Sequence, residues 1–228
     1  MTALVDFELR EAGDSALVLA LPERVDPLLN AWCIAVAGAL RDSLGSGVRD
    51  VVVGYCTVTV YFDPLASDPA WLENRIRALA ARVLRPSGSG GAAVDVPVCY
   101  GGEYGPDLDE VATFAGCTAG EVAVLHSQTA YRVYLLGFVP GFAYMAAVDP
   151  RIARPRRSTP RTTVPPGSVA IAGEQTGVYP GATPGGWNII GRTPVRPYDP
   201  SRPEPFLFRP GDLVRFHPID RSEYLRLA

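Results

Sequence analysis

Glycine and proline are spread so unevenly that the two parts of this chain must fold in different ways. The 228 residues include 23 glycines and 22 prolines, of which 9 fall in residues 1–85 and 36 in residues 86–228. Both residue types interrupt helices and strand interiors and are typical of turns. We therefore expect a domain of long elements at 1–85, a flexible Pro/Ser/Gly linker at 86–91, and a domain of short strands at 92–228.

The first part shows the apolar spacing of two amphipathic helices between strands. Apolar residues recur at helical intervals in residues 28–40 and 72–83, each time after an Asp-Pro pair, Asp26-Pro27 or Asp68-Pro69. Asp can cap such a helix and Pro can occupy its first turn. Aliphatic, β-branched and aromatic side chains predict strands at residues 16–21, 51–53 and 57–62. The pattern predicts a small α+β domain with two helices on one side of a sheet.

The second part is predicted to be mainly β structure. Strands are expected at residues 94–99 and 130–136, and turn signals recur every few residues from Gly137 onward. Two short helices are expected between these strands, the first capped by Asp107 and the second opened by a capping box at Thr118. Short strands separated by such turns indicate a closed barrel or a sandwich.

Residue types that are absent exclude several mechanisms. All 21 basic residues are arginine, so there can be no Walker-A lysine, Schiff-base lysine or Ser-Ser-Lys amidase triad. The four cysteines form no C-x-x-C pair and there are only two histidines, so we expect neither a His/Cys zinc site nor a disulfide framework. No stretch has the pattern of a membrane span or a signal peptide, which predicts a cytoplasmic protein. The four cysteines are expected to be small core residues.

Charge is divided along the chain in three blocks. Residues 1–85 carry 8 Arg against 11 acids, residues 86–149 carry 1 against 7, and residues 150–228 carry 12 against 6. The segment 150–173 contains no acid, and its arginines are Arg151, Arg154, Arg156, Arg157 and Arg161. Such an array suits a carboxylate or a phosphate, or else it pairs with the acidic middle block.

Aromatic and glycine-rich segments offer a candidate pocket. The segment LGFVPGFAYM at residues 136–145 carries Phe138, Phe142 and Tyr144, which either fill one end of a barrel or form the wall of a pocket. Gly185 and Gly186 permit close approach of a ligand to the backbone. Neutral hydrogen-bonding groups surround them on Gln175, Thr176, Trp187 and Asn188.

These strings together resemble the family variously named the B subunit of bacterial 5-oxoprolinase, subunit 1 of allophanate hydrolase, and the sporulation kinase inhibitor. The resemblance in the second part rests on GGEYGPDL at 101–108, LHS at 125–127, LGFVPGFAYM at 136–145, PRRSTPR at 155–161, AGEQTGVYP at 172–180, TPGGW at 183–187, IGRTP at 190–194 and PGD at 210–212. In the first part, GDSAL at 13–17 and YFDP at 61–64 fit the family's N-terminal domain.

The resemblance implies a small α/β N-terminal domain followed by a cyclophilin-like β-barrel with short helices. It also implies a hydrolase subunit that shares its active site with a sister subunit, of the type of allophanate hydrolase subunit 2 or the C subunit of 5-oxoprolinase, with a possible third subunit. The two sister subunits together are similar to the carboxyltransferase part of urea carboxylase. In the three-component 5-oxoprolinase, ATP-dependent opening of the pyroglutamate lactam gives glutamate, and ATP is used by the complex without necessarily binding this chain.

The expected site residues follow from these segments. They are His126 for proton transfer, Arg157 and Arg161 for an anionic group, Phe138, Phe142, Tyr144 and Trp187 as a pocket wall, Gln175 and Thr176 for the polar end of the substrate, and Gly185, Gly186 and Arg192 around it. His126 has a second interpretation, as a complement to the dipole at its helix C-terminus. Two other functions stay open: a protein inhibitor of a sensor histidine kinase, and a prolyl isomerase that shares the barrel fold.

Overall fold

The computed structural model describes residues 5–45, 47–84, 86 and 90–228. Internal contacts divide the chain into two units, Met1–Gly90 and Gly91–Ala228, which we call the N-terminal unit and the barrel unit. Residues 87–89 of the predicted linker at 86–91 lie outside the described residues.

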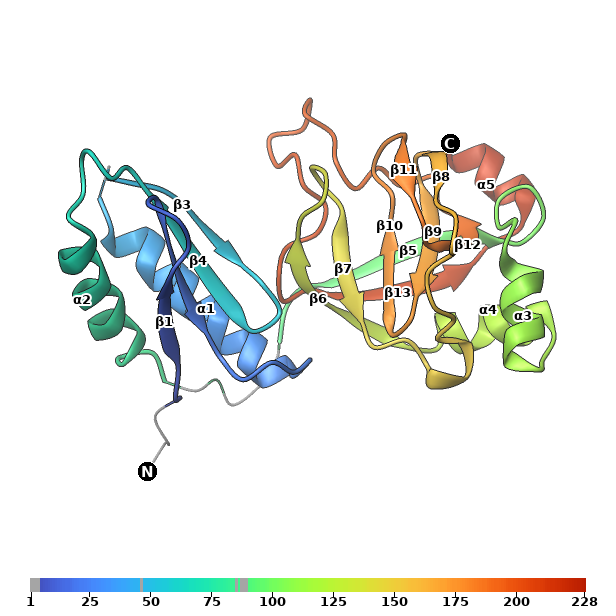
Figure 1. Ribbon diagram of the computed structural model, residues 1–228. Helices are drawn as coiled ribbons and strands as arrows, with labels where there is room; N and C mark the ends of the chain where they lie inside the picture. Colours follow the sequence, from blue (N-terminus) through green and yellow to red (C-terminus); the bar gives the residue numbers. More distant parts are fainter. Residues whose placement is uncertain (1–4, 46, 85, 87–89) are drawn as a thin grey trace. The chain divides into compact units, whose positions relative to one another are not determined.

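The N-terminal unit is an antiparallel sheet with both of its helices on one face (Figure 1). Its elements are β1 (Glu8–Glu11), β2 (Ala16–Ala20), α1 (Pro27–Ser43), β3 (Val48–Val53), β4 (Thr57–Phe62) and α2 (Pro69–Ala80), with strand order β1-β2-β4-β3. The Asp26 side chain accepts from the N–H of Leu28 at 2.8 Å, and Asp68 accepts from that of Ala70 at 3.1 Å. Both predicted helices and their Asp caps are confirmed, and so is the α+β architecture.

One core fills the space between this sheet and its helices. Alternate residues of β4, Val58 and Val60, are fully buried and pack with Trp32 of α1 and Ile76 of α2. Cys33 lies in the same core, where burial and the neighbouring Cys56 raise the pKa of its thiol to about 12. Of the four cysteines that were predicted to be core residues, three are buried and Cys117 is partly exposed.

The barrel unit is a closed barrel with strand order β10-β7-β6-β13-β5-β12-β9. Its strands are β5 (Ala93–Tyr100), β6 (Ala130–Leu136), β7 (Ala143–Ala146), β9 (Ser168–Ala172), β10 (Gln175–Val178), β12 (Asn188–Arg192) and β13 (Leu213–Pro218). A separate two-stranded sheet is formed by β8 (Arg161–Val164) and β11 (Thr183–Gly185). The other elements are α3 (Leu108–Ala115), α4 (Ala119–Ser127), the 3-10 turn η1 (Pro150–Ile152) and α5 (Arg221–Leu227). The predicted barrel with short helices is confirmed, whereas α5 was not predicted.

The helix caps of this unit meet the predictions in one case and depart from them in the other. Thr118 and Glu121 form the predicted capping box of α4, since each side chain bonds the backbone N–H of the other residue. Asp107 occupies the N-cap position of α3 but makes no side-chain cap hydrogen bond. The predicted position of Asp107 at the start of the helix is confirmed, but its side chain does not cap the helix because other donors occupy the carboxylate.

Strand β9 separates two hydrophobic layers, since all of its residues are buried. Val169 and Ile171 belong to the barrel core. Ala170 and Ala172 belong to a second cluster, which also contains Val164 of β8 and the rings of Phe142, Tyr179 and Trp187. This outer layer supports the candidate site. No helix among the described residues is long and apolar enough to cross a lipid bilayer.

Candidate functional site

A pocket of about 220 Å³ opens beside the outer hydrophobic cluster of the barrel unit. It is lined by Phe138, Phe142, Tyr144, Arg156, Pro160, Tyr179, Pro184, Gly185, Gly186 and Trp187. The structure thus brings together the predicted aromatic wall and both predicted glycines, although they come from segments about 40 residues apart in the chain.

Phe142 is the centre of the aromatic wall. Its ring meets those of Tyr144, Tyr179 and Trp187 at centroid distances of 4.9, 5.3 and 5.3 Å, with interplanar angles of 67°, 73° and 82°. Edge-to-face contacts of this kind stabilise aromatic pairs beyond the burial of their area. The four rings therefore form one packed surface beside the pocket.

Two glycines make room for these rings. A Cβ at Gly185 would overlap the Tyr179 ring, with Cε1 and Cζ at 2.9 Å. A Cβ at Gly177 would lie 2.8 Å from the carbonyl oxygen of Ala143 and 3.1 Å from Phe142 Cζ. Glycine is required at both positions because the backbone and the rings approach so closely.

Phe138 stands at the pocket's exposed side. Its ring is 59% exposed and contacts Phe142 edge-on at 5.6 Å. Its backbone has a φ of 67°, in the left-handed region that favours glycine. A non-glycine residue held there points to a requirement for the side chain.

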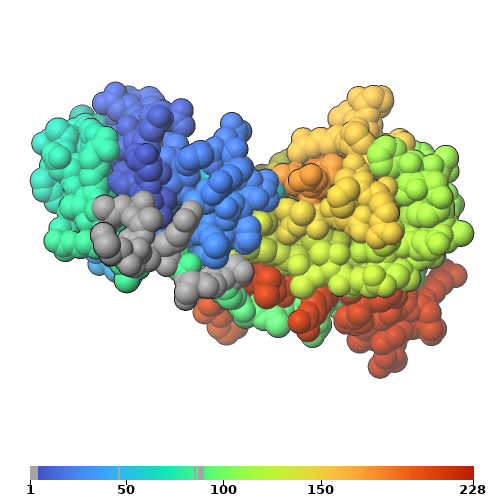
Figure 2. Space-filling model, turned by 90° about the horizontal axis from the view of Figure 1, so that it is seen from below, coloured from blue at the N-terminus to red at the C-terminus, as the bar shows by residue number. Residues whose placement is uncertain are grey.

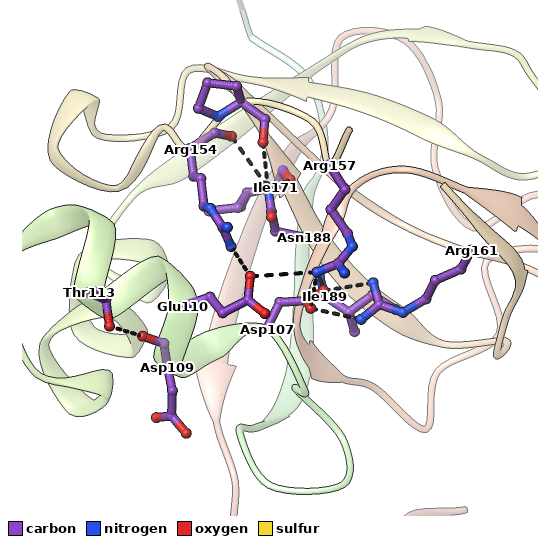
Figure 3. A network of polar contacts seen from close by, with 11 residues as sticks. Asp107, Asp109, Glu110, Thr113, Arg154, Arg157, Arg161, Ile171, Asn188 and Ile189 are labelled. Carbon is purple, nitrogen blue, oxygen red and sulfur yellow. Dashed lines mark hydrogen bonds and ion pairs between the residues drawn. The ribbon is translucent and has the colours of Figure 1, made fainter. Parts of the chain in front are cut away.

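Asp107 is the centre of a polar network next to the pocket (Figure 3). The carboxylate is buried, with the residue 1% exposed. One oxygen accepts from Arg157 Nη1 at 2.8 Å and from Arg161 Nη2 at 2.7 Å. The other accepts from Arg161 Nη1 at 2.8 Å and from the backbone N–H of Ile189 at 2.7 Å. Four donors fill the acceptor sites of this carboxylate, and the bonds to Asp107 raise the pKa of Arg161.

The arginine array pairs with the acidic middle block, as one of the two interpretations predicted. Besides the bonds to Asp107, Arg154 lies 2.7 Å and Arg157 lies 3.6 Å from a carboxylate oxygen of Glu110 on α3. Figure 2 shows the surface of the light-green segment that contains α3 against the yellow segment that follows it in the barrel unit. The anion held by Arg157 and Arg161 in this structure is the carboxylate of Asp107.

The network also fixes the backbone of residues 153–160, the loop between η1 and β8, which we call the pocket loop. Asn188 Nδ2 donates to the carbonyl oxygen of Pro155 at 2.9 Å. The backbone N–H of Arg157 donates to the carbonyl oxygen of Gly186 at 2.8 Å. Arg156 lies between these two anchored residues, and its guanidinium sits 5.8 Å from the centroid of the Trp187 ring.

His126 lies inside the barrel and outside the pocket. It is 0% exposed, and burial lowers the pKa of its imidazole to about 3. The single hydroxyl proton of Thr176 is donated to the carbonyl oxygen of Ala170 at 3.0 Å, so His126 Nε2–H donates to Thr176 Oγ1 at 2.8 Å. Nδ1 then accepts from the hydroxyl of Tyr100 at 2.7 Å. This neutral, satisfied imidazole has no surface for a substrate, and it carries no charge with which to complement the helix dipole.

The remaining predicted residues also lie apart from the pocket lining. Thr176 is fully buried against His126, and Gln175 precedes it on β10. Arg192 lies on β12, with its guanidinium 5.6 Å from the ring centroid of Tyr104. Because Gln175 and Thr176 are adjacent on β10, their side chains point to opposite faces of the strand.

Sequence reasoning did not single out three residues of this region. Tyr179 and Arg156 lie in the family motifs but are not among the expected site residues, and the sequence predicts Asp107 only as a helix cap. The acidic middle block and the basic last block predict that ion pairs form between them. Charge alone does not identify Arg157 and Arg161 as the partners of Asp107. Within the described residues, no group of three or more His, Cys, Asp or Glu side chains could hold a metal ion.

Comparison with known proteins identifies the family. The family model for the carboxyltransferase domain, subdomain C and D, matches residues 7–208. The chain belongs to this family. Among its relatives is the B subunit of 5-oxoprolinase from Bacillus subtilis (strain 168), which is 37% identical over 96% of this chain and 96% of its own length. The family resemblance found in the sequence motifs is confirmed.

Solved structures share the fold of this chain. The crystal structure of TTHA0988 matches with a TM-score of 0.81 and 37% identity over 93% of this chain, which spans only 40% of that protein. The K. lactis urea amidolyase matches 99% of this chain with a TM-score of 0.79, over 16% of the amidolyase, at 19% identity. At that identity the likeness establishes the fold alone. The predicted cyclophilin-like barrel is thereby confirmed.

Proposed function

We propose that this chain is the B subunit of an ATP-dependent 5-oxoprolinase and that its aromatic pocket is one part of a shared active site. The observation that carries the proposal is the 37% identity to the 5-oxoprolinase B subunit of Bacillus subtilis (strain 168) over nearly the full length of both chains. In the reaction, water adds across the lactam C–N bond of 5-oxoproline to give glutamate, while ATP is hydrolysed to ADP and phosphate.

The composition of the pocket supports a shared site. Its lining consists of aromatic rings, prolines, glycines and one arginine, with no carboxylate, imidazole or thiol among them. Such a surface binds and orients a small molecule but has no group that transfers protons near neutral pH. We therefore assign proton transfer and ATP chemistry to a sister subunit of the 5-oxoprolinase C type and to a third subunit.

Reconstitution tests this proposal directly. The chain is mixed with its sister subunits, and glutamate release from 5-oxoproline is measured with and without ATP. We expect turnover by the complete set with ATP, and none when this chain is omitted or assayed alone. Equal turnover in its absence, or no turnover by the full set, contradicts the proposal.

A further inference from the structure

Among the five arginines of segment 151–161, one has a different environment. Arg151 pairs with Asp149 at 2.7 Å. Arg154, Arg157 and Arg161 pair with carboxylates that α3 and its N-cap residue provide. Arg156 makes no hydrogen bond or ion pair to any residue that the structure describes, and it is the arginine of this segment that lines the pocket.

The surroundings of Arg156 combine a fixed backbone with an available guanidinium. The neighbouring Pro155 accepts a hydrogen bond from Asn188 at the start of β12. Arg157 donates its backbone N–H to Gly186, which lies just before that strand. Arg156 is exposed, and its guanidinium lies over the Trp187 ring. A guanidinium edge presents parallel donors that match the two oxygens of a carboxylate.

Neutral hydroxyls complete the polar part of the pocket. Burial raises the pKa of Tyr144 and of Tyr179, and the positive charge of Arg156 opposes that rise only in part. Both phenols therefore stay protonated near neutral pH and add no negative charge beside the guanidinium. The pocket is left with a single positive charge, contributed by Arg156.

The size and walls of the pocket restrict the ligand. A volume of about 220 Å³ is below the roughly 300–1,000 Å³ of sites for drug-sized ligands. Apolar surface comes from the exposed Phe138 ring and from Pro160 and Pro184. One positive charge beside an apolar wall suits a small cyclic acid better than a phosphate dianion, which usually requires several donors or cations.

We infer that Arg156 is the anion-binding residue of this pocket and holds the carboxylate of a small cyclic carboxylic acid whose ring packs against Phe138. The identity of that acid, 5-oxoproline, rests on the proposed function. The position of the positive charge in the pocket does not. Arg157 and Arg161 act indirectly: they anchor the loop to Asp107 and leave Arg156 as the group that meets the ligand.

Saturation-transfer NMR on the full chain, alone and assembled with its sister subunits, tests this inference with three probes. These are 5-oxoproline, 2-pyrrolidone, which has the same ring without the carboxylate, and inorganic phosphate. We expect Arg156→Gln to weaken 5-oxoproline binding by about tenfold to a hundredfold, because a charge-assisted hydrogen-bond pair is lost. Binding of 2-pyrrolidone should be weak and equal in both proteins. Arg215→Gln is the matched control, an exposed arginine on β13 outside the pocket, and should bind like the wild type.

The outcomes separate this inference from the proposed function. Three results would each overturn the inference. They are 5-oxoproline binding that is unchanged in Arg156→Gln, an effect of Arg156→Gln on phosphate binding only, and no binding of any probe to the wild type. If reconstitution gives no ATP-dependent turnover while 5-oxoproline still binds through Arg156, the inference stands and the proposed function falls. If turnover occurs but binding ignores Arg156, the proposed function stands and the inference falls.

Discussion

The carboxylate of Asp107 receives two hydrogen bonds from the guanidinium of Arg161, at 2.8 and 2.7 Å, although 54 positions separate the two residues in the chain. The same carboxylate binds Arg157 and the backbone of Ile189. One buried charge therefore holds both the pocket loop and the start of β12. The geometry of the pocket depends on a residue that does not line it.

Asp107→Asn tests this dependence through stability. The amide cannot neutralise two partly buried guanidiniums, so we expect a loss of about 3 kcal/mol in the unfolding free energy of the barrel unit, near the lower end for a broken buried pair. Urea unfolding measures it. Asp109→Asn is the matched control, since Asp109 is an exposed acid two residues away whose backbone carbonyl, and not its carboxylate, accepts from Thr113. Equal effects of the two substitutions would show that the network does not hold the loop.

Adjacent glycines provide a test of the aromatic wall. Gly185→Ala places a methyl group against the buried Tyr179 ring, and we expect it to cost about 1–3 kcal/mol through overpacking. Gly186→Ala meets its nearest atom, Pro160 Cγ, at an ordinary 3.6 Å and should stay within about 0.5 kcal/mol of the wild type. Near-UV circular dichroism should report a disturbed tyrosine environment in Gly185→Ala alone. An undisturbed Gly185→Ala spectrum with full stability would contradict the described packing.

Phe138→Gly should separate binding from stability. Glycine relieves the left-handed backbone conformation at this residue, worth about 1–2 kcal/mol, and this offsets the lost contact of a ring that is mostly exposed. We expect stability within about 1 kcal/mol of the wild type and weaker 5-oxoproline binding in the NMR titration. The contrast is Phe142→Ala, which empties the centre of the wall and should cost about 3–5 kcal/mol. Unchanged binding in Phe138→Gly would remove Phe138 from the site.

His126 predicts a pH dependence of stability. Its pKa is about 3 in the folded protein and 6.5 in its ordinary state, so below pH 6.5 the unfolded chain binds a proton that the folded chain does not. This contribution to the unfolding free energy therefore falls as the pH decreases, by up to about 1.4 kcal/mol per unit, and levels off near pH 3.

Two measurements check this dependence. The difference in unfolding free energy between the wild type and His126→Gln should narrow as the pH falls from 6 to 4. His217→Gln, at an exposed position on β13, is the matched histidine control. By NMR, the His126 ring signals should not titrate between pH 8 and pH 5. An imidazole that titrates near 6.5 would place His126 in contact with solvent and reopen a role in proton transfer.

Local rules accounted for much of the fold. The Asp26 and Asp68 caps and the Thr118 capping box act between residues two or three positions apart, so the sequence itself contains all the interacting groups. The glycine- and proline-rich second half indicated short strands in a closed β structure. Helix α5 was missed because its apolar residues are few and none of its side chains is buried.

The site was only partly predictable, since contacts between distant segments determine which polar side chains face the pocket. Arg156 and Arg157 are adjacent and identical in type, yet one faces the pocket and the other faces Asp107. Thr176 looked like a ligand-binding hydroxyl, but its position on β10 directs it toward His126. Such choices depend on strand register and loop path, which no spacing of residue types determines.

Steady-state kinetics of the assembled complex tests the central claim most directly, namely that this chain supplies a substrate-binding part of a 5-oxoprolinase site through Arg156. ATP-dependent glutamate formation is measured for complexes that contain the wild-type, Arg156→Gln or Arg215→Gln chain. The account predicts a KM for 5-oxoproline that rises at least about tenfold in Arg156→Gln and stays unchanged in Arg215→Gln. An Arg156→Gln complex with the wild-type KM and kcat would contradict it.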